Sequence, residues 1–263
     1  MCFGSRKRNI PAAINKAPTI RSMSPSKESE LLLSWLLLRT KFLKSVIQFD
    51  KPRLTRSIVA KYTAVELFGK WADLGRDKGM EEGHSHSVEL MMKRALERVP
   101  ENFIAIDVGC GNGWAVRKLA QEPECAHSYG VDGAESMINK ARSIDPKGEY
   151  FVGQLPGWSP QRKVDLVMSM EFIYYLEEPS YFINELYDKW LSSRGTIAIG
   201  IDHYSENEES LSWPDSLGVH MSTLSISDWE LVLKNAGFTN LEVFQATKDC
   251  ANPGTLILIG SKV

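Results

Sequence analysis

The sequence predicts an α/β fold: a doubly wound, mostly parallel sheet of seven strands that ends in an antiparallel hairpin and follows an N-terminal helical extension. Three observations predict it. From residue 100 onward, short apolar runs alternate with amphipathic helical stretches. The first apolar run ends in three closely spaced glycines. The last two runs, residues 240–247 and 254–263, are joined by a link too short for a crossover, so they should pair antiparallel.

Five apolar runs are predicted as the parallel strands, at residues 103–108, 128–132, 149–153, 164–170 and 195–202. Helices are expected after the first, second and fourth of them, the last of these over residues 179–191. A further helix follows the fifth strand in "SISDWELVLKNAGF". Ser227 and Glu230 have the spacing of a capping box at its start, and Gly237 is expected to end it.

The segment before the sheet is predicted to be helical. Residues 28–49 read as a basic amphipathic helix, suited to packing on its own domain or to lying on a membrane surface. A second helix is expected over residues 64–74. The sequence "GRDKGMEEGHSHS" then reads as a loop, and a third helix over residues 88–98 follows, with Ser85 or Ser87 as its N-cap.

Charge divides the chain near residue 61. The net charge of −2 combines a basic first part, residues 1–61 at +10, with an acidic remainder at −12. An acidic main part argues against binding a phosphate backbone, so no nucleic-acid partner is expected. We therefore predict three parts: residues 1–27, a disordered basic tail or targeting segment; residues 28–99, a helical lid or extension; and residues 100–263, the sheet domain.

Several features bear on the compartment. Residues 1–27 hold six basic residues and no acidic one, which resembles an organelle transit peptide interrupted by three prolines. The longest dense apolar run, residues 31–38, is much shorter than a membrane span, so no transmembrane segment is expected. A cytoplasmic protein is predicted, with a mitochondrion or plastid as the alternative. Free thiols in a reducing compartment are expected for the four cysteines, which form no close pair: Cys2, Cys110, Cys125 and Cys250.

The glycine-rich turn "GCGNG" lies where doubly wound sheets bind ligands, at the carboxyl end of the first strand. Glycines so close together suggest that something approaches the backbone more closely than a Cβ allows. A dinucleotide-binding turn would carry its third glycine one residue later, where Trp114 stands. A nucleoside triphosphate loop would continue with Lys-Ser or Lys-Thr, which is absent here.

The sequence "IDVGCGNG" resembles the first motif of the class I S-adenosylmethionine-dependent methyltransferases, and the resemblance extends over residues 100–263. It implies a Rossmann-like methyltransferase fold, S-adenosyl-L-methionine as cofactor, and methyl transfer as the activity. Gly109, Gly111 and Gly113 would face the methionyl part of the cofactor. Asp107 would help to hold its ammonium group. Asp132 would accept hydrogen bonds from both ribose hydroxyls, a role that suits the two oxygens of a carboxylate.

Other positions also follow the pattern of this family. Met137 would pack near the adenine, Gln154 would lie near the adenine amine, and the Leu155 amide would meet a ring nitrogen. The remaining residues in the implied cofactor site are Cys110, Gly133, Ser169 and Met170.

The methyl acceptor is predicted to be a small molecule. No nucleophile–base triad and no metal-ligand spacing is visible, and an in-line displacement needs mainly orientation and exclusion of water. No metal is therefore predicted, and the sequence does not indicate an oligomeric state. Two alternatives stay open: a protein or RNA methyltransferase, and a catalytically silent cofactor-binding partner protein.

His203 and Tyr204, just after the fifth strand, are predicted to face the methyl group, with the imidazole as general base. The competing interpretation is that His203 caps the strand. Glu171, Tyr174 and Tyr175 follow the fourth strand, and aromatic rings with a carboxylate would suit a cationic or amine acceptor. Three aromatic residues before the sheet are candidates either for a lid over the acceptor or for plain core: Tyr62, Phe68 and Trp71. His84 and His86 are interpreted as solvated or capping residues.

Overall fold

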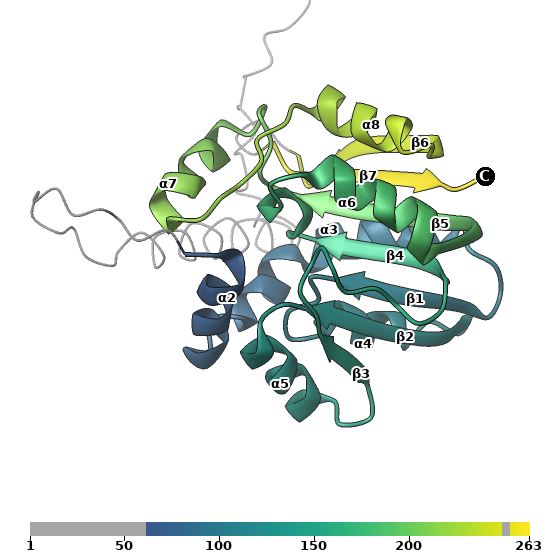
Figure 1. Ribbon diagram of the computed structural model, residues 1–263, viewed down its shortest axis with the longest axis horizontal. Coiled ribbons are helices and arrows are strands. Elements are labelled where there is room, and N and C mark those ends of the chain that lie inside the picture. The colour runs from purple at the N-terminus through teal and green to yellow at the C-terminus, as the bar shows by residue number, and fades with distance from the viewer. Residues whose placement is uncertain (1–61, 249–252) are drawn as a thin grey trace, which may run out of the picture.

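The computed structural model describes residues 62–248 and 253–263, so the predicted tail and the predicted helix over residues 28–49 lie outside the described residues. The described chain forms one seven-stranded sheet in the order β3-β2-β1-β4-β5-β7-β6 (Figure 1). The strands are β1 Phe103–Val108, β2 Cys125–Asp132, β3 Glu149–Val152, β4 Val164–Met170, β5 Leu191–Ile201, β6 Thr239–Ala246 and β7 Thr255–Ser261.

Strands β1 to β5 pair in parallel, whereas β7 is antiparallel to both of its neighbours, β5 and β6. The doubly wound sheet with a terminal hairpin is thus confirmed. Strand order reverses between β1 and β4, because β2 and β3 lie on one side of β1 and the later strands lie on the other. Such a reversal leaves a crevice at the carboxyl ends of the strands, where ligands usually bind.

Helices cover both faces of the sheet. On one face α3 and α4 pack against Ala105, Leu166 and Met168, and on the other face α6 and α8 pack against Ile106 and Val167. The two sets alternate along the strands, as side chains of a pleated strand must. The helices are α2 Ala64–Asp73, α3 Lys78–Leu96, α4 Trp114–Leu119, α5 Glu135–Ile144, α6 Pro179–Glu185, α7 Trp213–Leu217 and α8 Ile226–Asn235.

Helix α3 begins ten residues earlier than predicted, so the expected loop over residues 75–87 is wrong, and so is the N-cap at Ser85 or Ser87. Its N-cap is Asp77, a buried residue that accepts a hydrogen bond from Asn112 Nδ2 (2.8 Å) and forms an ion pair with Lys140. These are contacts with distant parts of the chain. The first turns of the helix face solvent and the crevice, so they lack the apolar periodicity that would have indicated a helix.

Helix α8 also starts earlier than predicted. Its capping box joins Ser225 and Asp228, because Ser225 Oγ accepts from the Asp228 amide at 3.1 Å, so the box predicted at Ser227 and Glu230 is wrong. Two overlapping Ser-x-x-acid patterns occur here. The helix that begins at the earlier one buries the side chains of Trp229 and Leu233 completely. In the part of the chain that the structure describes, no helix combines the length and apolar character needed to cross a membrane.

Candidate active site

The glycine turn after β1 lies at the carboxyl edge of the sheet, the edge toward which the arrowheads of β1 and β4 point in Figure 1. Its three glycines all have left-handed backbones, with φ of 75° at Gly109, 54° at Gly111 and 77° at Gly113. A Cβ at Gly109 would lie 2.5 Å from Phe172, and one at Gly113 would overlap the ring of Tyr150. At Gly111 the nearest atom is Met137 Sδ, 4.0 Å away, so only this glycine borders open space.

Asp132, the last residue of β2, is bonded to this turn. Its carboxylate accepts hydrogen bonds from the amides of Gly111 (2.9 Å) and Ala134 (2.7 Å). Burial raises the pKa of Asp132, while the two backbone hydrogen bonds act in the opposite direction. The carboxylate therefore fixes the turn and keeps further acceptor positions on its two oxygens.

Asp107, in β1, lies nearby and is also buried. Burial, with a contribution from the charge of Asp132, raises the pKa of Asp107 to about 7. Cys110 is buried beside Val116 and Ile138, and burial raises the pKa of its thiol. The Cys110 side chain thus belongs to the packing beneath the turn.

Two adjoining cavities open beside the turn, of about 30 Å³ and about 50 Å³. They share the lining residues Met80, Gly109, Gly111, Met170 and Glu171. The smaller cavity extends under α3, and the larger one extends between α2 and the end of β2. Among the described residues, the charged side chains that line one cavity or the other are all carboxylates, with no Lys or Arg: Asp77, Asp107, Asp132 and Glu171.

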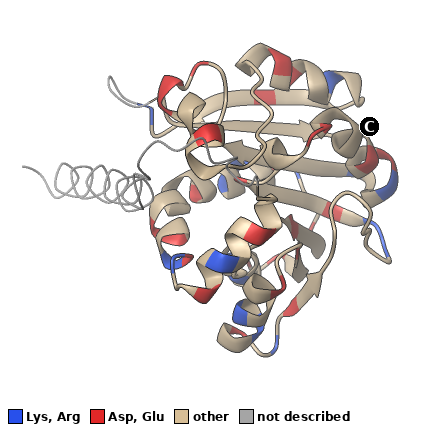
Figure 2. Cartoon of the chain, turned by 60° about the vertical axis from the view of Figure 1, so that its left-hand side comes forward, with Lys and Arg blue, Asp and Glu red and all other residues tan. Residues whose placement is uncertain are grey.

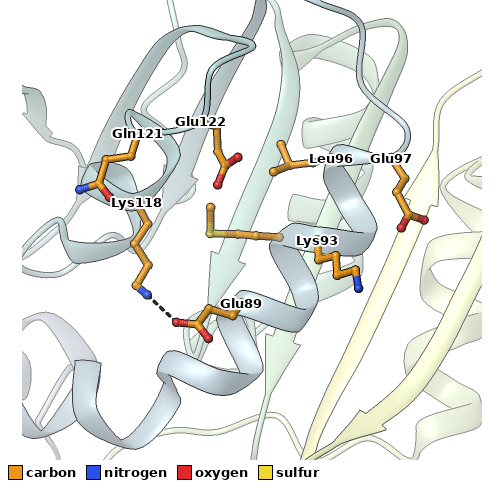
Figure 3. A pocket seen from close by; sticks show the side chains of 8 residues that line it. Glu89, Lys93, Leu96, Glu97, Lys118, Gln121 and Glu122 are labelled. Atoms are coloured by element: carbon orange, nitrogen blue, oxygen red, sulfur yellow. Dashed lines mark hydrogen bonds and ion pairs between the residues drawn. The ribbon is translucent and has the colours of Figure 1, made fainter.

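A larger groove of about 540 Å³ lies on the outer surface between α3 and the end of α4 (Figure 3). Its side chains include surface ion pairs such as Lys118 Nζ to Glu89 Oε1, at 2.8 Å. It contains neither the glycine turn nor the end of a parallel strand. Across the described residues, Figure 2 shows Lys and Arg scattered among Asp and Glu rather than gathered in one stripe. The chemistry therefore belongs to the two small cavities.

Three ionisable side chains from different elements meet at the far side of these cavities. His84 comes from α3, Glu171 follows β4, and Asp202 follows β5. His84 Nε2 lies 3.5 Å from Asp202 Oδ2, and His84 Nδ1 donates to the Met80 carbonyl at 2.8 Å. The Asp202 amide donates to Glu171 Oε1 at 2.5 Å. We call His84, Glu171 and Asp202 the acid–histidine cluster.

The members of this cluster shift one another's protonation. Burial by itself lowers the pKa of His84, but the hydrogen bond and charge of Asp202, together with the charge of Glu171, raise that pKa to about 9. Burial and the charge of Asp202 raise the pKa of Glu171 to about 8. The three ligand atoms lie within 4.8 Å of one another, a spacing that a metal ion could bridge. The contacts from His84 Nε2 to Asp202 Oδ2 and from the Asp202 amide to Glu171 Oε1 also place the three groups close enough to influence one another's protons.

The structure does not place His203 and Tyr204 where the sequence suggested. Both are completely buried, with His203 Nδ1 3.1 Å from the Ser210 carbonyl and Nε2 2.7 Å from Thr223 Oγ1. Burial lowers the pKa of His203. The Tyr204 hydroxyl donates to the Gly254 carbonyl at 2.9 Å. The expectation that this pair faces the methyl group is therefore wrong, because the chain turns inward after Asp202.

Several other candidates do not line the cavities. The Ser169 hydroxyl donates to the Val108 carbonyl at 2.9 Å and so joins β4 to β1. Leu155 belongs to the core and Gln154 is exposed. Trp71 is buried, with its ring 5.2 Å from that of Phe68, and Tyr62 is 41% exposed. Gly113 faces Tyr150.

The remaining candidates are brought together at the cavities. Gly133, Met137, Met170, Phe68 and Tyr175 line them with the turn residues. The Tyr174 hydroxyl donates to Glu171 Oε2 at 2.7 Å. Sequence reasoning missed the roles of His84 and Asp202. The position of Asp202 at the end of a parallel strand was a usable signal, whereas the position of His84 depends on the full length of α3.

Comparison with known proteins places this geometry in context. A family model described as a methyltransferase domain matches residues 82–243. The trans-aconitate 2-methyltransferase of Escherichia coli (O1:K1 / APEC) is 29% identical over 113 residues, which cover 43% of each chain. The match thus spans less than half the length of that relative.

Solved structures show the same fold. A chain from the complex between the Haloferax volcanii Trm112 methyltransferase activator and a methyltransferase is 28% identical, with a TM-score of 0.61, and the match covers 74% of this chain and 96% of that one. An S-adenosylmethionine-dependent methyltransferase from Mesorhizobium loti is 21% identical, with a TM-score of 0.54, covering 66% of this chain and 98% of that one. At that lower identity, the second likeness shows the fold alone.

Proposed function

The chain belongs to the class I S-adenosylmethionine-dependent methyltransferases, and on this premise we propose that it methylates a small molecule at the cavities beside Gly111. The observation that carries the proposal is the pairing of Gly111 with Asp132. The Gly111 amide is held by the Asp132 carboxylate at 2.9 Å, while the space where its Cβ would be stays open. A nucleoside cofactor at this edge of the sheet requires a backbone that it can approach closely and a carboxylate that can accept hydrogen bonds from its two ribose hydroxyls.

The residues present fit S-adenosylmethionine. Gly111 would provide close backbone approach, with Gly109 and Gly133 in the same lining, while Asp132 would accept from the ribose hydroxyls and Met137 would pack against the base. The thioether of Met137 lies 4.0 Å from the position of a Cβ on Gly111, which keeps an apolar wall beside the turn. Cavities of about 30 and 50 Å³ are small for ligand pockets, which reach several hundred Å³, so α2 would have to shift outward on binding.

The sulfonium of the cofactor supplies an electrophilic methyl group. The chain contributes orientation, exclusion of water and a negative field. Asp107 and Asp132 are buried at the cavities, and no Lys or Arg of the described chain joins them in the lining, so a ligand that carries a sulfonium and an ammonium group is favoured there. Burial raises the pKa of both carboxyls, with a smaller contribution from the charge of Asp132 at Asp107, and a bound cation would favour their ionised forms.

The relative named trans-aconitate 2-methyltransferase raises a carboxylate acceptor as one possibility for this chain. Recognition of a carboxylate normally uses Arg or Lys, because the charge-assisted hydrogen bonds must replace its hydration. Among the described residues, neither Arg nor Lys lines either cavity. The described geometry therefore supports an uncharged or cationic small molecule better.

Methyl transfer from S-adenosylmethionine labelled in its methyl group tests the proposal. The full-length protein would be incubated with a panel of small amines, thiols, alcohols and carboxylates, and separately with total protein and total RNA. We expect the label in the small-molecule fraction. Label confined to protein or RNA would contradict the acceptor class. Cofactor binding without any transfer would indicate a silent member of the family.

A further inference from the structure

Glu171 occupies a special position in the acid–histidine cluster, because it alone of the three lines both cavities. It follows β4 directly, at the point where strand order reverses. His84 and Asp202 lie behind it, and Tyr174 and Tyr175 lie beside it, with their hydroxyls 3.3 Å apart. Glu171 is therefore the member of the cluster that a bound acceptor would meet.

The backbone of Glu171 is strained. Its φ of 56° lies in the left-handed region, which a glycine would adopt at little cost and which costs other residues on the order of 1 kcal/mol. The conformation is held by the Glu171 amide, which donates to the Gly200 carbonyl at 2.9 Å, and by the two hydrogen bonds that its carboxylate accepts. A glutamate retained where glycine would be easier points to a use for its side chain.

The surroundings of the Glu171 carboxylate suit a cation. The rings of Phe68, Phe172 and Tyr175 line the larger cavity, and aromatic faces attract ammonium groups. No Lys or Arg within residues 62–248 and 253–263 lines either cavity and competes for the carboxylate. The imidazole of His84, the basic member of the cluster, is directed at Asp202. An amine, which enters as its ammonium form, would find its counter-charge at Glu171.

We propose that the acceptor is an amine and that Glu171 binds its ammonium form and takes up its proton, with His84 and Asp202 as positioning residues; this rests on the proposed methyl transfer. The proton passes from nitrogen to the Glu171 carboxylate, which frees the nitrogen lone pair. The nitrogen lone pair forms the new bond to the methyl carbon as the carbon–sulfur bond breaks. The electron pair of the broken bond stays on the sulfur, which becomes a thioether. Glu171 then releases the proton to water.

His84 and Asp202 act through Glu171. The Asp202 amide fixes Glu171 Oε1, and the Asp202 carboxylate holds the imidazolium. The Asp202 charge favours the protonated form of Glu171, while His84 favours the ionised form. These opposed influences keep the Glu171 carboxyl able both to accept and to release a proton near neutral pH, which is what a general base requires.

Calorimetric binding of three probes of similar shape tests this proposal. Benzylamine, benzyl alcohol and benzoate would be titrated into the full-length protein saturated with S-adenosylhomocysteine. We expect benzylamine to bind at least tenfold more tightly than the other two. Glu171→Gln should abolish this preference, and Glu89→Gln, a matched change in the outer groove of Figure 3, should keep it. Benzoate binding as tightly as benzylamine, or no benzylamine binding, would overturn the proposal.

The same titrations in buffers of different ionisation enthalpy give a second readout. At pH 7.5 the Glu171 carboxyl, whose pKa is about 8, is partly protonated, so binding of a cation should release a proton to the buffer. Glu171→Gln should remove this release. His84→Gln should move it to higher pH, because the imidazolium lowers the pKa of Glu171. A purely structural role for these residues would leave proton release unchanged.

Two further results separate the alternatives. A benzylamine preference that needs added Mg²⁺ or Zn²⁺, or that disappears with a chelator, would overturn the proton-sharing role of the cluster. Tight binding of S-adenosylhomocysteine without a preference for benzylamine would refute the amine acceptor and leave the proposed methyl transfer intact. Failure to bind S-adenosylhomocysteine would instead refute the proposed function.

Discussion

The two cavities beside the glycine turn are bordered by two groups of residues, one at the ends of β1 and β2 and one at the ends of β4 and β5, and the two groups are built in different ways. On the β1–β2 side, the turn at Gly109–Gly113 and the carboxylate of Asp132 come from one short stretch of chain, and they are joined through backbone amides. On the β4–β5 side, His84, Glu171 and Asp202 come from three distant segments, and they are joined by one contact between two side chains and one from the Asp202 amide to the Glu171 carboxylate. A site made of backbone geometry depends on local sequence, whereas a site made of side chains depends on the completed fold.

The largest expected effect concerns the glycines of the β1–β2 side. Gly113→Ala should destabilise the protein by about 3 kcal/mol, since its Cβ would overlap Tyr150 and its φ is left-handed. Gly111→Ala should cost only about 1 kcal/mol, because the backbone alone is strained there. Denaturant unfolding measures both. Equal losses would show that the two glycines do not have the separate roles assigned to them.

Asp132→Ala should weaken binding of S-adenosylmethionine by about 2 kcal/mol, the scale for losing charge-assisted hydrogen bonds. Part of this loss would come from the Gly111 and Ala134 amides, which would lose their acceptor. Asp132→Asn, which keeps an acceptor oxygen for one amide, should lose less. An affinity that stays unchanged in a folded Asp132→Ala variant would remove this residue from the cofactor site.

The β4–β5 side predicts an effect of pH on stability. The pKa of Glu171 is raised to about 8 in the folded protein, above its ordinary 4.5, so its contribution to stability falls as pH rises from 4.5 to 8. Gln does not ionise, so the Glu171→Gln variant does not lose stability in this way as pH rises. The variant should therefore be more stable than the native protein at pH 8, by about 1 kcal/mol or roughly 2–4 °C in Tm. Thermal unfolding at pH 5 and pH 8 checks the sign: the stability of the variant relative to the native protein should rise between these two pH values, and a relative stability that falls or stays constant would refute a raised pKa.

The smallest effect is expected at His203. Its ring nitrogens face Ser210 and Thr223 inside the protein, so His203→Gln, which can keep one of these contacts, should change kcat/KM by less than about threefold. Steady-state rates and a melting curve would separate lost activity from lost stability. A hundredfold fall in kcat/KM in a folded variant would restore His203 as a base.

The sequence predicted one side of the pocket much better than the other. The positions of the strands along the chain and the turn at Gly109–Gly113 follow from apolar periodicity and glycine spacing, which are local signals. The start of α3 at Lys78 does not follow from such signals, because Asp77 is held by Asn112 and Lys140 from later in the chain. Local signals therefore predict a loop at His84 and a base at His203, whereas His84 lies in α3 and His203 is buried in the core.

The claim that the cofactor lies against Gly111 is tested most directly by titrating three proteins with S-adenosylmethionine. They are the native chain, Gly111→Ala, and Gly69→Ala in α2, where an added Cβ would likewise meet no atom within 4 Å. We predict that the native protein and Gly69→Ala bind with equal affinity, while folded Gly111→Ala loses at least about tenfold, because its methyl group fills space that the cofactor needs. No binding by the native protein, or full affinity in Gly111→Ala, would contradict the account.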